Sequence, residues 1–208
     1  MATVMGSDAI PASSTDQAPT SRVVRHAGID RLFHWLTAAS VLTLMATGLL
    51  PVLGVKFNWV VVHWITGVVL IVLVLFHIVR SLIWQHFRTM WFTREQISRE
   101  KVGKYSVAQK LMHIAMTLMI LGAAITGAFM LAKMDTPFWK RDPYLLAQET
   151  WGVMYAIHGL AALSAVTLVM IHIYFGLLPE NRMYLRAMIK GWITRQELIQ
   201  HHDAHSRK

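Results

Sequence analysis

The sequence predicts an all-α integral membrane protein, a bundle of four helices with the N- and C-termini both on the cytoplasmic side. Mean hydropathy is +0.44 and 15% of the residues are charged, whereas a soluble domain has about a quarter. Four stretches contain no Asp, Glu, Lys or Arg, and each is long enough to cross a bilayer, which takes about 20 apolar residues. They are residues 32–55, 57–79, 111–132 and 150–179.

Each stretch predicts one helix, because none shows the alternation of a membrane β-barrel strand. The first is expected to end near Leu50, because Pro51 cannot continue a helix. The fourth is long enough to tilt or to project beyond the lipid. Tryptophans near the predicted boundaries are interpreted as anchors in the headgroup region. These tryptophans are Trp59, Trp64, Trp84, Trp91, Trp139 and Trp151.

The distribution of Lys and Arg predicts the orientation. Sixteen of these residues flank the spans on the side of the chain ends, and four lie in the two loops on the other side. The side with more Lys and Arg is predicted to be cytoplasmic. The net charge of +9 therefore sets membrane orientation and indicates no nucleic-acid partner.

Three segments are predicted along the chain. Residues 1–21 are rich in Ala, Ser, Thr and Pro and lack the apolar core of a signal peptide, which predicts a disordered tail. Residues 22–180 form the membrane domain, and residues 181–208 form a basic cytoplasmic tail.

The absence of cysteine excludes disulfides within the chain, thiolate-ligated clusters and covalent c-type haem attachment. Any redox cofactor would therefore use other ligands, and histidine is the obvious choice. Six histidines lie within or at the edges of the spans, where ionisable residues are rare and usually functional. The charge-free stretches offer these histidines no Asp or Glu partner, which argues against a proton relay built from His–Asp pairs. The pattern favours neutral imidazoles bound to metal. The six are His34, His63, His77, His113, His158 and His172.

The fourth span carries two of these histidines, His158 and His172. Their separation in the sequence is about four helical turns, which places them about 21 Å apart along a helix and on nearly the same face. One helix can thus offer an axial ligand to each of two stacked macrocycles. At the predicted depths, only His63 can complete the outer site.

Three histidines have the depth to complete the inner site. His77 competes with His34, because the interval from His63 to His77 equals that of the pair in the fourth span. Two helices would then carry all four ligands, with His63 facing His158 and His77 facing His172. This arrangement would resemble the four-histidine bundle of the quinol–cytochrome c reductase cytochrome b. Spacing alone does not decide between His34 and His77. The third, His113, is interpreted as a packed histidine.

Several segments resemble the cytochrome b (gamma) subunit of respiratory formate dehydrogenases, a family of dihaem four-helix membrane cytochromes. They are GIDRLFHW at 28–35, VGKYSVAQK at 102–110, IHG at 157–159, MIHIYFG at 170–176 and HH at 201–202. The resemblance covers about residues 22–202. The GKY element and the spaced histidine pair in the last span are its most specific parts.

The resemblance implies two b-type haems. Carried onto this sequence, His34 and His172 would bind the cytoplasmic-side haem, and His63 and His158 the outer one. The resemblance thus favours His34 over His77, whose position holds an apolar residue in the family.

The resemblance also implies a quinone site near the inner haem, beside the GKY element. The stretch departs from the family pattern at two positions. Ser106 replaces an Asn of the family, and Ala108 replaces a Gly. These departures put the detailed contacts and the quinone type, menaquinone or ubiquinone, in question. The residues carried over are Gly103, Lys104, Tyr105, Ser106, Gln109, Lys110 and His172.

The expected function is electron transfer in the bacterial inner (cytoplasmic) membrane, in a respiratory complex with an iron–sulfur (beta) subunit and a molybdopterin catalytic (alpha) subunit. A higher oligomer of that complex is compatible with the resemblance. The chain itself has no residue expected to act on formate. One alternative is the same type of subunit serving a hydrogenase or a thiosulfate or polysulfide reductase. An alternative of another class is a haem-free membrane transporter or assembly factor.

Overall fold

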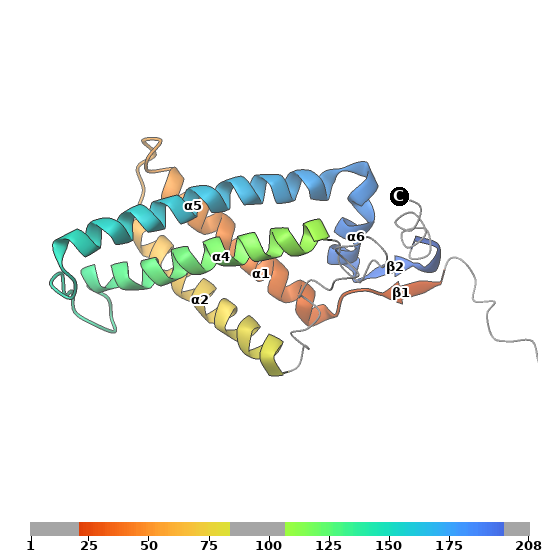
Figure 1. Ribbon diagram of the computed structural model, residues 1–208, viewed down its shortest axis with the longest axis horizontal. Helices are drawn as coiled ribbons and strands as arrows, with labels where there is room; N and C mark the ends of the chain where they lie inside the picture. The colour runs from red at the N-terminus through yellow and green to blue at the C-terminus, as the bar shows by residue number, and fades with distance from the viewer. Residues whose placement is uncertain (1–20, 84–106, 198–208) are drawn as a thin grey trace, which may run out of the picture.

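The computed structural model describes residues 21–83 and 107–197. Within them, four long helices meet the length and hydropathy expected of membrane spans (Figure 1). They are α1 (Gly28–Leu49), α2 (Trp59–Ile83), α4 (Val107–Met130) and α5 (Gln148–Leu177). The helix α1 ends just before Pro51 as the sequence predicts, because proline lacks the amide proton that the next helical turn would need.

The helices form two antiparallel hairpins, α1–α2 and α4–α5, which cross in Figure 1. We call the end of the bundle with the α1–α2 and α4–α5 loops the loop end. A small core joins the hairpins, with Val41, Leu70 and Val169 packed together. The helices α4 and α5 approach closely at Gly122, where an added Cβ would lie 3.7 Å from the Cβ of Ala161. Small residues at such a crossing let two backbones come together, as is usual between membrane helices.

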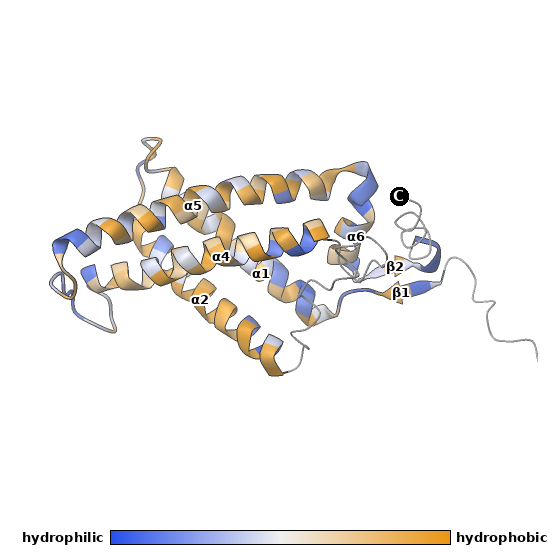
Figure 2. Ribbon diagram, viewed as in Figure 1, coloured by the Kyte–Doolittle hydropathy of each residue, from blue (hydrophilic) through white to orange (hydrophobic). Residues whose placement is uncertain are grey.

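Most of the apolar surface of the four helices faces outward. Figure 2 shows hydrophobic residues along the helix bodies and hydrophilic ones near their ends and in the loops. Large side chains in the middle of the spans are well exposed, such as Val72 at 59% and Leu160 at 69%. In water this surface would be unfavourable, whereas lipid tails solvate it without cost.

The helices extend beyond the charge-free stretches at the end opposite the loop end. The helix α1 begins at Gly28, before residue 32, and includes Asp30, while α2 continues past residue 79 to include Arg80. These two side chains form a salt bridge of 2.5 Å between the helices. Paired in this way, the charges can lie at the edge of a membrane span.

The same end carries a small antiparallel sheet that joins the two ends of the described chain. The strand β1 (Arg22–Val24) pairs with β2 (Trp192–Thr194), with Val23 opposite Ile193 (Figure 1). We call this sheet the clip and this end of the bundle the clip end. No strand was predicted in residues 22–24 or 181–208, because strands of three residues are too short to leave an alternating pattern.

The segment between α5 and the clip consists of η3 (Pro179–Asn181) and α6 (Arg182–Lys190). Gly191 ends α6 with a φ of 87°, a left-handed conformation that glycine adopts without strain. Its carbonyl oxygen then accepts hydrogen bonds from the amides of Arg25 and His26. The turn at Gly191 thus fixes α6 against the segment before α1.

One predicted anchor differs in the structure. Trp151, at the loop end of α5, is fully buried instead of facing the headgroup region. Its indole nitrogen donates to the carbonyl oxygen of Pro143 at 3.0 Å, and the ammonium of Lys133 lies 4.7 Å from its ring centre. The loop between α4 and α5 folds over this indole, a contact that sequence position alone does not reveal.

Candidate haem sites

The six histidines of the spans form three facing pairs. In each pair the ring centres are 6.3 Å apart. Two imidazoles that bind one metal through one nitrogen each, with bonds of about 2 Å, have ring centres about 6 Å apart. The spacing within each pair is therefore that of two axial ligands on one iron. The pairs are His34 with His172, His63 with His158, and His77 with His113.

The structure thus brings together both predicted ligand pairs. The rival for the inner site, His77, faces His113 and not His172. Helix rotation explains this arrangement, because His77 on α2 points toward α4 while His172 on α5 points toward α1. The two predicted pairs also lie at different depths, since about four helical turns separate His158 from His172.

Threonine hydroxyls contact both histidines of the pair nearer the loop end. Thr47 Oγ1 lies 2.8 Å from His63 Nδ1, and Thr126 Oγ1 lies 3.0 Å from His158 Nδ1. Each threonine comes from the other helix of the same hairpin, α1 for His63 and α4 for His158. The two hairpins therefore hold the histidine nearer the loop end in the same way.

The contacts of Thr47 favour one protonation of the His63 ring. The Thr47 hydroxyl has one proton, and the carbonyl oxygen of Thr43 lies nearest to it at 2.7 Å. When the hydroxyl donates there, its oxygen can only accept from His63, so His63 Nδ1 donates and the lone pair is on Nε2.

The same reasoning applies to His158, with an independent second partner. Thr126 donates to the carbonyl of Gly122 at 2.7 Å, and His158 Nδ1 also lies 3.0 Å from the carbonyl oxygen of Ala123. A carbonyl can only accept, so His158 Nδ1 is protonated and its Nε2 is available to a metal. Neutral imidazoles oriented by a hydrogen bond at Nδ1 are what an axial haem ligand requires. The residues present therefore fit a b-type haem.

Glycines beside the two threonines give the outer imidazoles room. A Cβ added to Gly127 would lie 3.2 Å from His158 Cε1, which is tighter than an ordinary contact. A Cβ added to Gly48 would lie 3.8 Å from His63 Cε1. Each outer histidine thus rests against a Thr-Gly dipeptide of the preceding helix.

Helix α6 lies next to the start of α1, which carries His34. The Arg31 guanidinium donates to the carbonyl of Ile189 at 2.7 Å, and the Trp35 indole donates to that of Met188 at 3.3 Å. Trp35 also lies edge-on to His34, with ring centres 5.3 Å apart. Hydrogen bonds to α6 therefore fix α1 at Arg31, before His34, and at Trp35, after it.

The quinone candidates are only partly within the described residues. Gly103, Lys104, Tyr105 and Ser106 lie outside them. Gln109 is at the start of α4 and its side chain hydrogen-bonds to Tyr184 of α6, while Lys110 is buried at 3% exposure.

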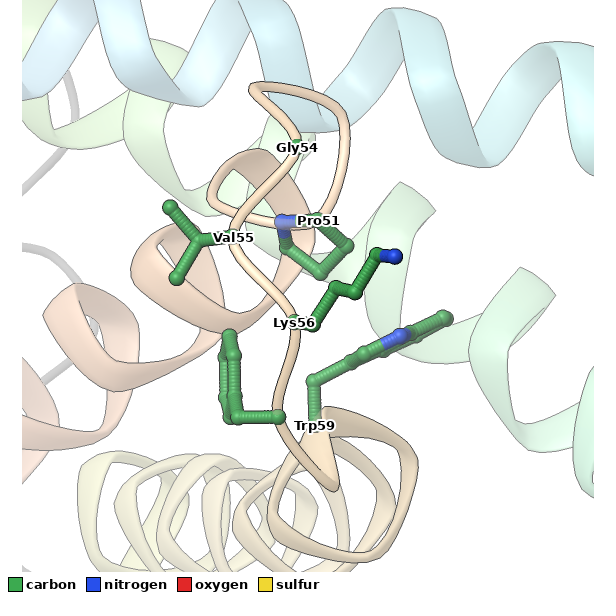
Figure 3. Close-up of a pocket in the computed structure, with 6 residues that line it drawn as sticks. Pro51, Gly54, Val55, Lys56 and Trp59 are labelled. Carbon is green, nitrogen blue, oxygen red and sulfur yellow. The ribbon is translucent and has the colours of Figure 1, made fainter.

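An open hollow of about 320 Å³ lies at the loop end, where α1 turns into α2 (Figure 3). Trp59 is part of its lining and lies edge-on to His63, with ring centres 6.2 Å apart. Pro51, Gly54, Val55 and Lys56 are also part of the lining. The hollow is therefore adjacent to the outer pair but is formed by loop residues and contains none of the histidines.

Reasoning from the sequence missed two features of these sites. It assigned His113 to packing, although His113 is exposed in the structure and faces His77. It also overlooked Thr47 and Thr126, whose identical Thr-Gly context was a usable signal.

Comparison with known proteins shows what the chain is similar to. The family model described as "Prokaryotic cytochrome b561" matches residues 25–191. The cytochrome b556(fdo) subunit of formate dehydrogenase from Escherichia coli K12 is 24% identical over 204 residues, covering 86% of this chain and 90% of the relative. The same subunit from Escherichia coli O6:H1 and O157:H7 matches equally.

The family is one of b-type cytochromes, which implies haem b as cofactor. The four candidate spans agree with a multi-pass protein of the inner membrane. With most of its length matched by the family model, this chain belongs to the prokaryotic cytochrome b561 family.

Proposed function

We propose that the chain is the membrane-anchoring dihaem cytochrome b subunit of a formate dehydrogenase complex. It would pass electrons from an iron–sulfur subunit, through two b-type haems, to menaquinone or ubiquinone at the cytoplasmic side. The observation that supports this most is the pair of facing histidine sets at two depths, His63 with His158 and His34 with His172. The formate dehydrogenase subunit named above supports the choice of complex.

The roles of the residues follow from their places. His63 and His158 would hold the outer haem, and His34 and His172 the inner one. When bound, each haem supplies reversible one-electron redox chemistry at iron. Thr47 and Thr126 would keep these imidazoles in the Nδ1-protonated form and leave Nε2 free to bind haem iron.

The distribution of charge supports the orientation. By sequence, sixteen of the Lys and Arg residues that flank the spans belong to the terminal segments and to the connection between α2 and α4, and four belong to the two loops of the loop end. We therefore assign the clip end to the cytoplasm. Electrons would then enter at the loop end, on the far side of the membrane.

The loop end is also where the iron–sulfur subunit would dock. Apolar side chains in its two loops are highly exposed, with Val52 at 82% and Phe138 at 81%. Tyr144 is exposed at 91%. Exposed apolar and aromatic side chains at the rim of a membrane domain are typical of a contact with a partner protein.

The quinone site would lie at the clip end, beside the start of α4. Gln109 and Lys110 are the candidates among the described residues, and the Gln109 side chain is held by Tyr184. Quinone reduction there would take two electrons and two protons, the protons coming from the cytoplasm. Oxidation outside and proton uptake inside would charge the membrane.

The same geometry could serve a hydrogenase or a thiosulfate or polysulfide reductase, because this chain does not contact the donor's substrate. A haem-free transporter or assembly factor is disfavoured by the facing histidine pairs. The donor is tested in membranes that contain the intact complex, by adding formate, hydrogen or thiosulfate separately and recording the b-type absorption band. We expect formate alone to reduce it. Reduction only by another donor would reassign the complex.

A further inference from the structure

The helix α6 lies at the boundary of the membrane domain. It follows Leu177, the last residue of the span α5, after the short turn of η3. Pro179 opens that turn, and in Figure 1 the chain then bends so that α6 lies across the clip end instead of continuing along α5. A helix in this position can contact both the lipid headgroups and the first part of the acyl chains.

An open hollow of about 350 Å³ lies where α6 meets the end of α5. Apolar side chains form one part of its lining, namely Leu177, Leu185 and Ile189. Leu177 is 60% exposed and Ile189 is 55% exposed. This part of the hollow therefore offers a hydrocarbon surface next to the last turn of a membrane span.

Basic side chains form the other part of the lining. Arg182, Arg186 and Lys190 follow one another at every fourth position of α6, so they lie along one side of the helix. Like charges at this spacing repel one another, and an anion between them would relieve the repulsion. The hollow thus has an apolar side and a cationic side.

Most of this positive charge has no counter-ion in the described part of the chain. Arg186 forms a salt bridge with Glu197, whereas Arg182 and Lys190 are exposed and form no salt bridge within residues 21–83 and 107–197. The Arg186 Nε is buried and has no hydrogen-bond acceptor among the same residues. Phosphate oxygens are the acceptors that guanidinium and ammonium groups bind most readily.

The combination of the two sides favours a lipid over a free anion. An anionic phospholipid carries its phosphate directly above its acyl chains, and the hollow places cationic and apolar side chains next to each other in the same way. A free phosphate would use the cationic side and leave Leu177 and Ile189 exposed. The four spans place this end of the bundle at a bilayer surface, where phospholipid is abundant.

We propose that this hollow binds the headgroup of an anionic phospholipid. Arg182, Arg186 and Lys190 would surround the phosphate, and Leu177 and Ile189 would contact the start of the acyl chains. The lipid would then link α6 to the end of α5. This inference goes beyond the proposed function and does not depend on whether the chain binds haem.

The test compares lipids of different charge on the purified full-length protein. The chain is delipidated in detergent and titrated with phosphatidylglycerol or with phosphatidylcholine, and bound lipid is counted by native mass spectrometry. We expect one phosphatidylglycerol to bind each chain about tenfold more tightly than phosphatidylcholine. Equal binding of the two lipids would overturn the proposal, because α6 would then be a basic helix that simply faces water.

Neutral variants test the residues. Arg182→Gln and Lys190→Gln should each weaken phosphatidylglycerol binding about fivefold, and the double variant should lose the preference over phosphatidylcholine. Arg186 is left unchanged because it also pairs with Glu197. The matched control, Lys140→Gln with Arg141→Gln, removes the same charge from exposed positions at the loop end and should keep the preference. An equal loss in the control would show that overall charge attracts the lipid, and it would contradict a site in this hollow.

Inorganic phosphate distinguishes a lipid site from a simple phosphate site. Added at the concentration of the lipid, it should leave phosphatidylglycerol bound, because it makes no contact with the apolar side chains. Displacement of the lipid would reassign the hollow to free phosphate. Circular dichroism shows whether each variant keeps its helix content, and the lipid preference of the wild type decides the proposal without the variants.

Discussion

The Nδ1 atom of His158 donates to the backbone oxygen of Ala123 over 3.0 Å, and the same atom lies 3.0 Å from the hydroxyl of Thr126. Both partners come from α4, so one helix fixes the tautomer of a histidine on its neighbour. The proposed outer haem site would therefore be shaped by the helices that precede His63 and His158 in each hairpin.

Removing the hydroxyls should weaken the outer site. In Thr47→Val and Thr126→Val the Nδ1 proton loses an acceptor, and loss of such an outer-shell partner typically costs about ten- to hundredfold in metal affinity. We expect the outer haem to dissociate more readily, measured as haem transfer to apomyoglobin. Thr47→Ser and Thr126→Ser should restore retention.

Thr167→Val is the matched control for both changes. Thr167 also donates to the carbonyl four residues earlier, but it is exposed on α5 and contacts no histidine ring within the described part of the chain. Equal haem loss in this control would show that any threonine removal destabilises the bundle, and it would contradict the assigned role.

Gly127 should be intolerant of a side chain. In an ordinary helix, glycine to alanine stabilises by about 0.5–1 kcal/mol. In Gly127→Ala, however, the new Cβ would lie 3.2 Å from His158 Cε1 and push the imidazole away. We expect lower occupancy and a shifted absorption band of the outer haem. Gly159→Ala, with no atom within 4 Å of the new Cβ, should leave the spectrum unchanged.

His34 and His172 should behave as a unit. We expect His34→Leu, His172→Leu and the double variant each to lose the same single haem, because one ligand alone does not hold it. The outer haem should remain, and redox titration should show its midpoint nearly unmoved. If His34→Leu keeps every haem while His172→Leu loses one, a different residue completes the inner site.

The clip should depend on the charge of Glu197. Partial burial raises the pKa of this carboxyl, but hydrogen bonds from Arg186 and from the Thr194 amide lower it more, so the pKa lies below its usual range. A carboxyl with a depressed folded-state pKa contributes stability above its unfolded pKa and loses it as pH falls through the folded value. Below that value the clip should open.

Hydrogen exchange of the Thr194 amide measures this opening across acidic pH. Protection should fall as Glu197 becomes protonated. Glu197→Gln should show weaker protection at neutral pH and lack the acidic step, while Glu180→Gln, a substitution in η3, should behave as the wild type. If the exchange profile of Glu197→Gln matched that of the wild type, the charge of Glu197 would not stabilise the clip.

The four helices, and the place of each histidine along its helix, follow from the sequence alone. A membrane span has one dominant signal, its apolar length, and the interval between His158 and His172 converts directly into distance along a helix. Pro51 likewise marked the end of α1 correctly.

Contacts between helices were harder to predict, because they depend on how each helix is rotated. The spacing of His63 and His77 is the same as that of the α5 pair, so spacing could not exclude His77 as the partner of His172. In the structure, packing turns His77 toward His113. The two Thr-Gly dipeptides were visible in the sequence. That Thr47 contacts His63 and Thr126 contacts His158 became clear only from the structure.

The measurement that tests the central claim most directly is the spectrum of the purified full-length chain. A reduced-minus-oxidised optical spectrum reports low-spin b-type haem, and electron paramagnetic resonance of the oxidised protein reports bis-imidazole ligation. The account predicts both signatures in the wild type, and loss of the outer component in His158→Leu. A chain that is folded in the membrane and shows no low-spin b-type band would contradict it.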